Sequence, residues 1–166
     1  MDHAASLLKF ARYPEACEVA RKIVAQDAEH VGALEILAKG LWHCGQYKDV
    51  LVILRRLTVI NPYEPGYRAL QGASLQCLGR YGEAARAFAS SSQLPSSQEA
   101  LRELRSWQAG LVQDMLKTDA VFKAHYERDE KEACLSRGFD FVDDERQQDR
   151  WLNTTSNRIE LYIRPS

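Results

Sequence analysis

RYPEA at residues 12–16 returns as QYKDV at 46–50 and as RYGEA at 80–84. The tyrosine of each phrase, at positions 13, 47 and 81, lies 34 residues from the next one. Other columns keep this period and hold a leucine, a small residue or an apolar residue; they are Leu7, Leu41 and Leu75, then Ala11, Gly45 and Gly79, then Ala20, Leu54 and Phe88. A fixed period of this length indicates repeated helical units that stack on one another.

These columns resemble those of the tetratricopeptide repeat, a unit of two antiparallel helices, over about residues 1–95. The resemblance implies an all-α fold: a right-handed helical-repeat solenoid of three repeats, with a capping helix and a small helical C-terminal extension. The pattern also makes physical sense, because small residues let paired helices approach closely while larger ones fill the space around the crossing. Repeats of this family hold other polypeptides, so the resemblance implies binding rather than chemistry.

The pattern of residues 96–117 predicts the capping helix. SSQE at 96–99 has the form of a capping box, in which a serine caps the helix and a glutamate follows three residues later. Apolar residues then recur at helical spacing and are interrupted only by Gln108. They are Ala100, Leu101, Leu104, Trp107, Leu111, Val112 and Met115. Because a solenoid with an open apolar end would aggregate, we expect this helix to complete a domain of residues 1–117.

The second predicted domain, residues 118–166, begins with a helix. Asp119 is the predicted cap of this helix, which we expect to run from about residue 120 to 137 and to stop at Gly138. Its middle is densely charged, which is typical of a face exposed to solvent.

A second resemblance covers about residues 117–152. Ala133, Gly138, Phe139 and Phe141 are spaced as in the small leader domain of nitrogen-fixation-associated proteins and of some ribosomally made peptide precursors. No double-glycine cleavage site follows them. The resemblance leaves an alternative function open, in which the repeats carry a leader-like or modifiable C-terminal peptide that a peptide-modifying enzyme recognises.

The C-terminal tail, residues 153–166, opens with a polar run and then alternates with period two, which predicts an extended strand. Ile159, Leu161 and Ile163 share one face of such a strand. A lone strand has nothing to pair with in an all-helical chain, so the tail is either free or docked, in the groove or on a partner. We expect residues 156–166 to become ordered only in a complex or in a homo-oligomer formed through the tail.

Composition limits the classes of partner. The 166 residues are enough for about one domain, and a net charge of -1 provides no basic excess with which to hold nucleic acid. No apolar run is long enough to cross a membrane, and the N-terminus carries no secretory signal. We therefore expect a cytoplasmic protein that binds neither nucleic acid nor membranes.

The sequence contains no arrangement typical of a catalytic or metal site. It has no glycine-rich phosphate loop, no G-x-S-x-G and no pair of histidines at ligand spacing. Cys17, Cys44, Cys77 and Cys134 are scattered, so we interpret them as small apolar residues rather than as metal ligands or a disulfide framework. We expect the chain not to be an enzyme and to need no cofactor or metal ion.

The resemblance to the repeat family also implies a groove lined by the first helix of each repeat. Carried over by alignment, its partner-binding positions are Ala5, Leu8 and Lys9, then Glu35, Lys39, Trp42 and His43, then Ala69, Ala73, Gln76 and Cys77. Trp42 is the one large aromatic among small residues, so it is the predicted anchor for a bound segment.

The partner implied by this groove is another protein or a peptide segment. The Lys, Asn and Arg clamp with which one subgroup of the family binds acidic chaperone tails is absent from the matching positions, for example Ala5 and Ala73. A segment that mixes apolar and polar residues therefore fits better than a carboxylate tail. We predict a module for protein–protein interaction, acting as an adaptor, an assembly factor or a small chaperone.

Overall fold

The computed structural model describes residues 2–139, and this part of the chain contains nine helices and no strand. The helices are α1 (Asp2–Lys9), α2 (Tyr13–Gln26), α3 (Val31–His43), α4 (Tyr47–Ile60), α5 (Pro65–Cys77), α6 (Tyr81–Ala89), α7 (Pro95–Thr118), α8 (Ala120–Arg128) and α9 (Glu130–Ser136). The prediction of an all-α fold is confirmed for these residues.

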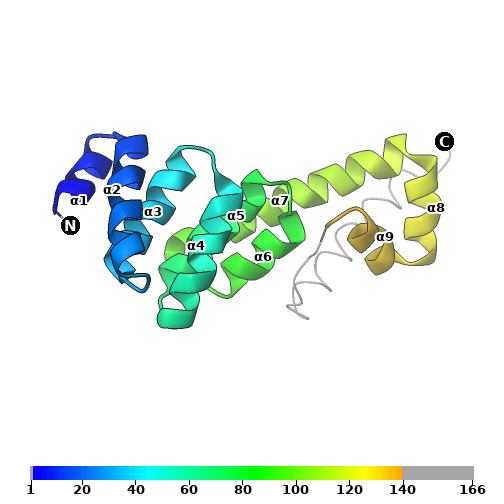
Figure 1. Cartoon of the computed structure of the whole chain (residues 1–166). Coiled ribbons are helices and arrows are strands. Elements are labelled where there is room, and N and C mark those ends of the chain that lie inside the picture. The colour runs from blue at the N-terminus through cyan, green and yellow to red at the C-terminus, as the bar shows by residue number, and fades with distance from the viewer. Residues whose placement is uncertain (1, 140–166) are drawn as a thin grey trace, which may run out of the picture.

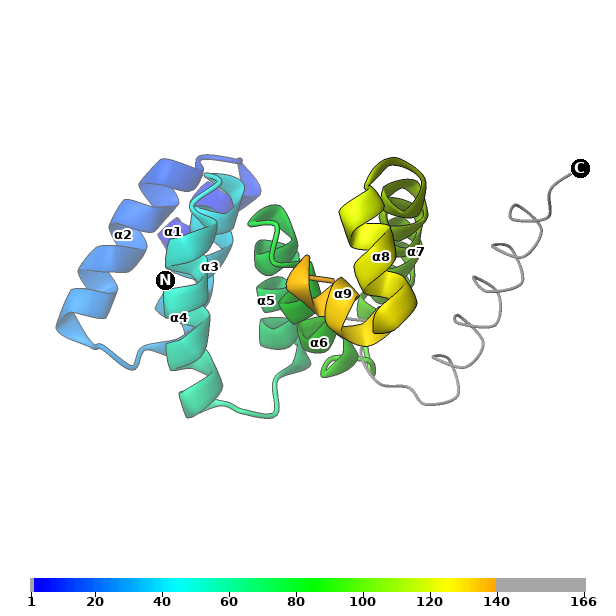
Figure 2. The ribbon, with the colours of Figure 1, turned by 90° about the vertical axis from the view of Figure 1, so that its right-hand side faces the viewer.

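Helices that follow one another in the chain lie side by side (Figure 1). Each packs mainly against its neighbours in sequence, and α1 also contacts α3. The row leads from α1 to α7, a long helix that extends beyond α6 (Figure 1). Figure 2 shows α8 and α9 turning back from its far end. The chain after α9 reaches α6, because the carbonyl oxygen of Gly138 accepts a hydrogen bond of 3.3 Å from the amide of Gly82.

The 34-residue period of the sequence recurs in the backbone. α2, α4 and α6 all begin at the repeated tyrosine, and the residue two positions earlier has a positive φ: 56° at Ala11, 73° at Gly45 and 74° at Gly79. Glycine adopts this left-handed conformation without strain, whereas alanine carries a steric cost. The repeated small residue therefore makes the sharp turn between two antiparallel helices.

Buried apolar residues form three clusters along the row. The first joins α1 to α4 and reaches Tyr67 of α5; the second joins α5, α6 and the first half of α7; the third joins the second half of α7 to α8 and α9. The contact between α5 and α6 is close, because a Cβ atom at Gly72 would lie 2.7 Å from the ring of Phe88. These two helices reach their observed separation because Gly72 has no side chain.

α7 starts earlier than the sequence suggested, and the predicted capping box is wrong. Leu94 is the N-cap and Pro95 is the first helical residue, a position at which the missing N–H of proline costs nothing. Ser97 consequently lies inside the first turn, where it is buried and accepts a hydrogen bond of 2.9 Å from the hydroxyl of Ser91. The proline, rather than a serine, sets the start of the helix.

The buried face of α7 differs from the predicted stripe in two places. Leu104 and Val112 are buried as expected. Trp107, expected to be buried, is 44% exposed and contacts the ring of Tyr81 edge-on, at 4.4 Å between centroids. Gln108, expected to interrupt the stripe, is fully buried within it. The helix therefore buries the amide of Gln108 completely, whereas the indole of Trp107 packs at the surface against α6.

The single helix predicted over residues 120–137 is divided in two. Asp119 caps α8 as predicted, because its carboxylate accepts a hydrogen bond of 2.9 Å from the amide of Phe122. The chain then becomes extended at Asp129, which caps α9 in the same way. The break allows Cys134 to turn back and pack in one cluster with Phe122. Gly138, with a φ of 79°, ends α9 as expected.

Several predictions concern residues 140–166 and lie outside the part of the chain that the structure describes. They include Phe141 and much of the leader-like segment, the strand in the tail, and the docking of the tail. Within residues 2–139, no helix combines the length and the apolar character needed to cross a bilayer.

Candidate functional site

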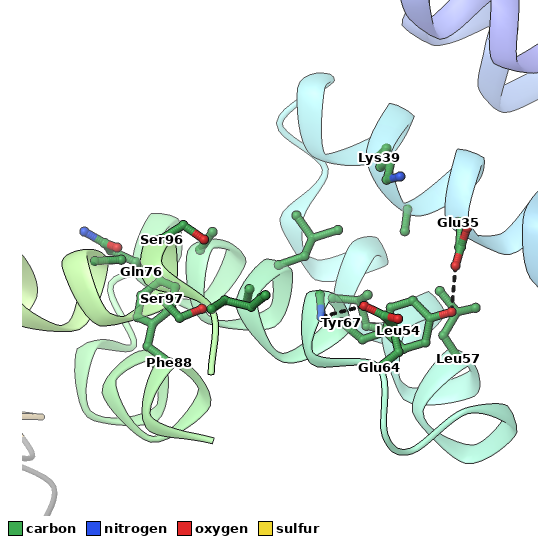
Figure 3. A pocket seen from close by; sticks show the side chains of 17 residues that line it. Glu35, Lys39, Leu54, Leu57, Glu64, Tyr67, Gln76, Phe88, Ser96 and Ser97 are labelled. Carbon is green, nitrogen blue, oxygen red and sulfur yellow. Dashed lines mark hydrogen bonds between the residues drawn. The ribbon is translucent and has the colours of Figure 1, made fainter. Parts of the chain in front are cut away.

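A pocket of about 600 Å³ opens between α3, α4, α5, α6 and the start of α7 (Figure 3). It is lined by Glu35, Ala38, Lys39, Leu54, Leu57, Glu64, Gly66, Tyr67, Ala69, Leu70, Ala73, Gln76, Phe88, Leu94, Ser96, Ser97 and Ala100. Its volume is within the range of known ligand pockets, so it has room for side chains of a bound segment.

α5 supplies much of the wall because its small residues recur at helical spacing. Gly66, Ala69, Ala73 and Gln76 are separated by three or four residues, which places them on one face of the helix. The limited bulk of Gly66, Ala69 and Ala73 leaves the space that the pocket occupies. The buried leucines of α4 and Phe88 of α6 form its deeper, apolar wall.

Tyr67 connects α5 to α3 at one end of the pocket (Figure 3). Its hydroxyl donates a hydrogen bond of 2.7 Å to Oε1 of Glu35, and the residue is 6% exposed. Burial raises the pKa of Tyr67, and the hydrogen bond to Glu35 raises that pKa further. The phenol therefore stays protonated at neutral pH and remains a donor to the carboxylate.

Two carboxylates lie at this end of the pocket. Besides Glu35 there is Glu64, the N-cap of α5, whose Oε1 accepts a hydrogen bond of 3.0 Å from the amide of Gly66. Burial and Glu35 are the main causes of the raised pKa of Tyr67, and the charge of Glu64 adds to them. Glu64 is therefore within electrostatic reach of the hydroxyl that Glu35 binds.

The rest of the polar lining is different in kind. Lys39 is exposed and makes no ion pair with any other residue between 2 and 139. Gln76, Ser96 and Ser97 lie together, away from the two carboxylates (Figure 3). The pocket thus combines an apolar wall with an anionic end and a neutral polar end.

Some of the partner-binding positions predicted from the repeat pattern meet in this pocket. They are Glu35, Lys39, Ala69, Ala73 and Gln76, which come from α3 and α5. The remaining predicted positions do not line it. Those are Ala5, Leu8, Lys9, Trp42, His43 and Cys77.

The predicted positions on α1 and at the end of α5 lie apart from the pocket. Ala5 and Leu8 are half-buried and pack against the first core cluster, so they serve the contact with α3. Lys9 is exposed at the last position of α1. Cys77 is exposed and hydrogen-bonds to Tyr47, the main cause of the raised pKa of that phenol.

Trp42, the predicted anchor, packs inside an aromatic group instead of reaching the pocket. Its ring meets His43 at 5.1 Å and Tyr47 at 6.3 Å, both edge-on, and it packs against the first core cluster. His43 in turn stacks on Tyr13, with 4.2 Å between ring centroids. Nε1 of Trp42 is buried and has no hydrogen-bond partner among residues 2–139.

The sequence prediction missed part of the lining at α3 and α5, namely Ala38, Glu64, Gly66, Tyr67 and Leu70, and all of the lining that comes from other helices. Leu54 and Phe88 lie on α4 and α6, and Ser96 and Ser97 lie in the first turn of α7. An alignment that assigns the groove to one helix per repeat leaves these residues out. One signal was available: a capping helix must begin beside the helix pair that it covers, so its first turn borders any groove there.

The thiol and carboxylate side chains of the described residues do not form a metal site. Within residues 2–139, no three His, Cys, Asp or Glu side chains come together in a way that could hold a metal ion. Cys17 and Cys134 are buried, and burial raises the pKa of Cys134 to about 12. Cys44 and Cys77 are exposed, so burial supports the interpretation as small apolar residues only for Cys17 and Cys134. The two exposed cysteines each stand at the end of a helix, where the chain turns outward.

No family model matches the chain, and no curated protein has a matching sequence.

Proposed function

We propose that this chain is an interaction module that binds a segment of another polypeptide in the pocket between α3, α5 and α7. It acts as an adaptor, an assembly factor or a small chaperone. One observation carries the proposal: Glu35, Lys39, Ala69, Ala73 and Gln76, chosen from the repeat pattern alone, line a single pocket.

The proposal includes three tetratricopeptide repeats as the scaffold. Two features support this assignment. α2, α4 and α6 begin at the same column of the repeat, and the left-handed residue of each turn also falls in one column. Consecutive helices pack on one another throughout the row, as the stacking of helical repeats requires.

The chemistry of the lining suits a peptide. Ala69 and Ala73 leave room for a bulky side chain, and burying apolar surface there contributes about 25 cal/mol per Å². Glu35 and Gln76, toward opposite ends of the pocket, offer polar groups that would fix the direction of the bound segment (Figure 3).

Blocking the pocket tests the proposal. Peptides that bind the full chain are selected from a display library of short random sequences, and their affinity is measured for Ala73→Trp and for Ala124→Trp. Ala73 lines the pocket, whereas Ala124 is exposed on α8. We expect Ala73→Trp to abolish binding and Ala124→Trp to leave it unchanged.

A second variant guards against misfolding. Gln76 also lines the pocket but is exposed, so Gln76→Trp covers the opening without disturbing the core. Thermal melts show whether each variant is folded. Selected peptides that bind both pocket variants as tightly as the unaltered chain would overturn the proposal.

A further inference from the structure

The two ends of the pocket differ in charge, and this difference restricts what the pocket can hold. Glu35 and Glu64 are half-buried at the end where Tyr67 lies, and among residues 2–139 each has only one oxygen in a hydrogen bond. The second oxygen of each carboxylate is available to a ligand. At the other end, Gln76 and the serines of α7 carry no charge (Figure 3).

Lys39 offsets these carboxylates only in part. It is exposed, so water and salt screen its charge more strongly than they screen the half-buried carboxylates. The amino end of α5 offsets about half a charge at Glu64, its cap. Glu35 lies on α3, and from the described part of the chain its side chain receives the single hydrogen bond of Tyr67. The region around Tyr67 therefore stays negative.

We propose that the pocket selects a segment in which an arginine or lysine stands next to aliphatic side chains. The aliphatic groups lie against the leucines of α4 and Phe88, and the cation lies against Glu35 and Glu64. An arginine fits well, because its planar group carries several donors for carboxylate oxygens. This inference rests on the proposed peptide-binding function and names the class of segment bound.

The test uses the same random-peptide selection on the full chain. The tightest selected peptide that contains arginine is synthesised in two forms, with its arginine and with citrulline, which has a similar shape but no charge. Both forms are titrated against three proteins: the unaltered chain, the double variant that combines Glu35→Gln and Glu64→Gln, and the single variant Glu18→Gln. Glu18 is an exposed carboxylate of α2 outside the pocket and serves as the matched control.

Glutamine at positions 35 and 64 keeps an acceptor for the hydroxyl of Tyr67 and for the amide of Gly66. The double variant is therefore expected to fold, which thermal melts check, and Glu35→Gln alone replaces it if they show otherwise. We expect citrulline to weaken binding to the unaltered chain about five- to tenfold. Replacing arginine by citrulline should not change the affinity of the peptide for the double variant.

The remaining outcomes separate the two proposals. Selected peptides that Ala73→Trp blocks, but that are acidic or uncharged, would overturn the charge preference and leave the proposed function standing. Equal affinity of the arginine and citrulline forms for the unaltered chain would also overturn the charge preference and leave the proposed function standing. If no selected peptide is sensitive to Ala73→Trp, both proposals fail.

Discussion

At Gly72, one absent side chain decides how closely α5 and α6 pack. A Cβ at this position would lie 2.7 Å from two ring carbons of Phe88, which is only 4% exposed and cannot swing away. Overpacking of this kind costs about 1–3 kcal/mol, while replacing glycine within a helix contributes about 0.5–1 kcal/mol in the other direction. We therefore expect Gly72→Ala to lower the free energy of unfolding by about 1 kcal/mol, measured by urea denaturation.

Gly110 provides the matched control for this prediction. It also lies within a helix, but a Cβ there would meet nothing within 4 Å. Gly110→Ala is therefore expected to raise stability by about 0.5–1 kcal/mol. If Gly72→Ala raised stability as much as Gly110→Ala does, the close approach at Gly72 would not be limiting.

Tyr67 makes the free energy of unfolding depend on pH in the alkaline range. Burial, and then Glu35, raise its pKa in the folded chain, so the folded state holds the phenolic proton more tightly than the unfolded state. This contribution is fully present below the ordinary tyrosine pKa of about 10 and is lost as the pH rises above it. Tyr67→Phe removes the contribution together with the hydrogen bond, which is typically worth about 1 kcal/mol.

Stability measured against pH checks this expectation. The unaltered chain should be more stable than Tyr67→Phe at pH 7, and the difference should shrink as the pH rises above about 10. A stability difference that stays constant up to strongly alkaline pH would mean that the folded and unfolded states bind the phenolic proton of Tyr67 equally tightly.

At the scale of the helices, the sequence predicted well wherever one signal acted alone. The period predicted equivalent repeated units, and α2, α4 and α6 all begin at the tyrosine of that period. At α7 two signals competed, since a proline and a capping box stand next to each other. The helix follows Pro95, and Ser97 is buried within it.

The break between α8 and α9 shows where local pattern reaches its limit. Residues 120–137 suit one continuous helix by composition, and Asp129 is an ordinary member of a charged run. The break brings Cys134 into the cluster with Phe122 and Val112, a contact between residues that are distant in sequence. Tertiary packing of this kind leaves no periodic signal in the sequence.

The site was predictable to a similar extent. Alignment found Glu35, Lys39, Ala69, Ala73 and Gln76, because a repeat fixes which face of a helix points outward, but it did not select Glu64 or Tyr67 of the same lining. It also pointed to Trp42, which packs beside His43 instead. Whether a large aromatic fills a core or a groove depends on the helices around it, and the repeat pattern does not record how those side chains are arranged.

Considered as a whole molecule, the described chain is a row of helices in which contacts are mostly between neighbours. The pocket lies where the first two core clusters meet, since Leu54 belongs to the first and Phe88 to the second. A segment bound there would touch both clusters at once. Occupation of the pocket would therefore add a link between parts of the row that otherwise meet mainly through α4 and α5.

The same arrangement predicts that damage in one cluster stays local. Leu104 is 1% exposed in the second cluster, and Leu104→Ala is expected to cost about 2–5 kcal/mol. In a row held by neighbour contacts, stability is close to a sum of local terms, so α5, α6 and α7 should lose protection first. Amide hydrogen exchange should rise strongly in those helices and little in α2 and α3. Val121 is exposed, so Val121→Ala serves as the control and should raise amide exchange neither in α5, α6 and α7 nor in α2 and α3. An equal rise along all of residues 2–139 would instead mean that the clusters unfold as one unit, and that the row behaves as a single cooperative core.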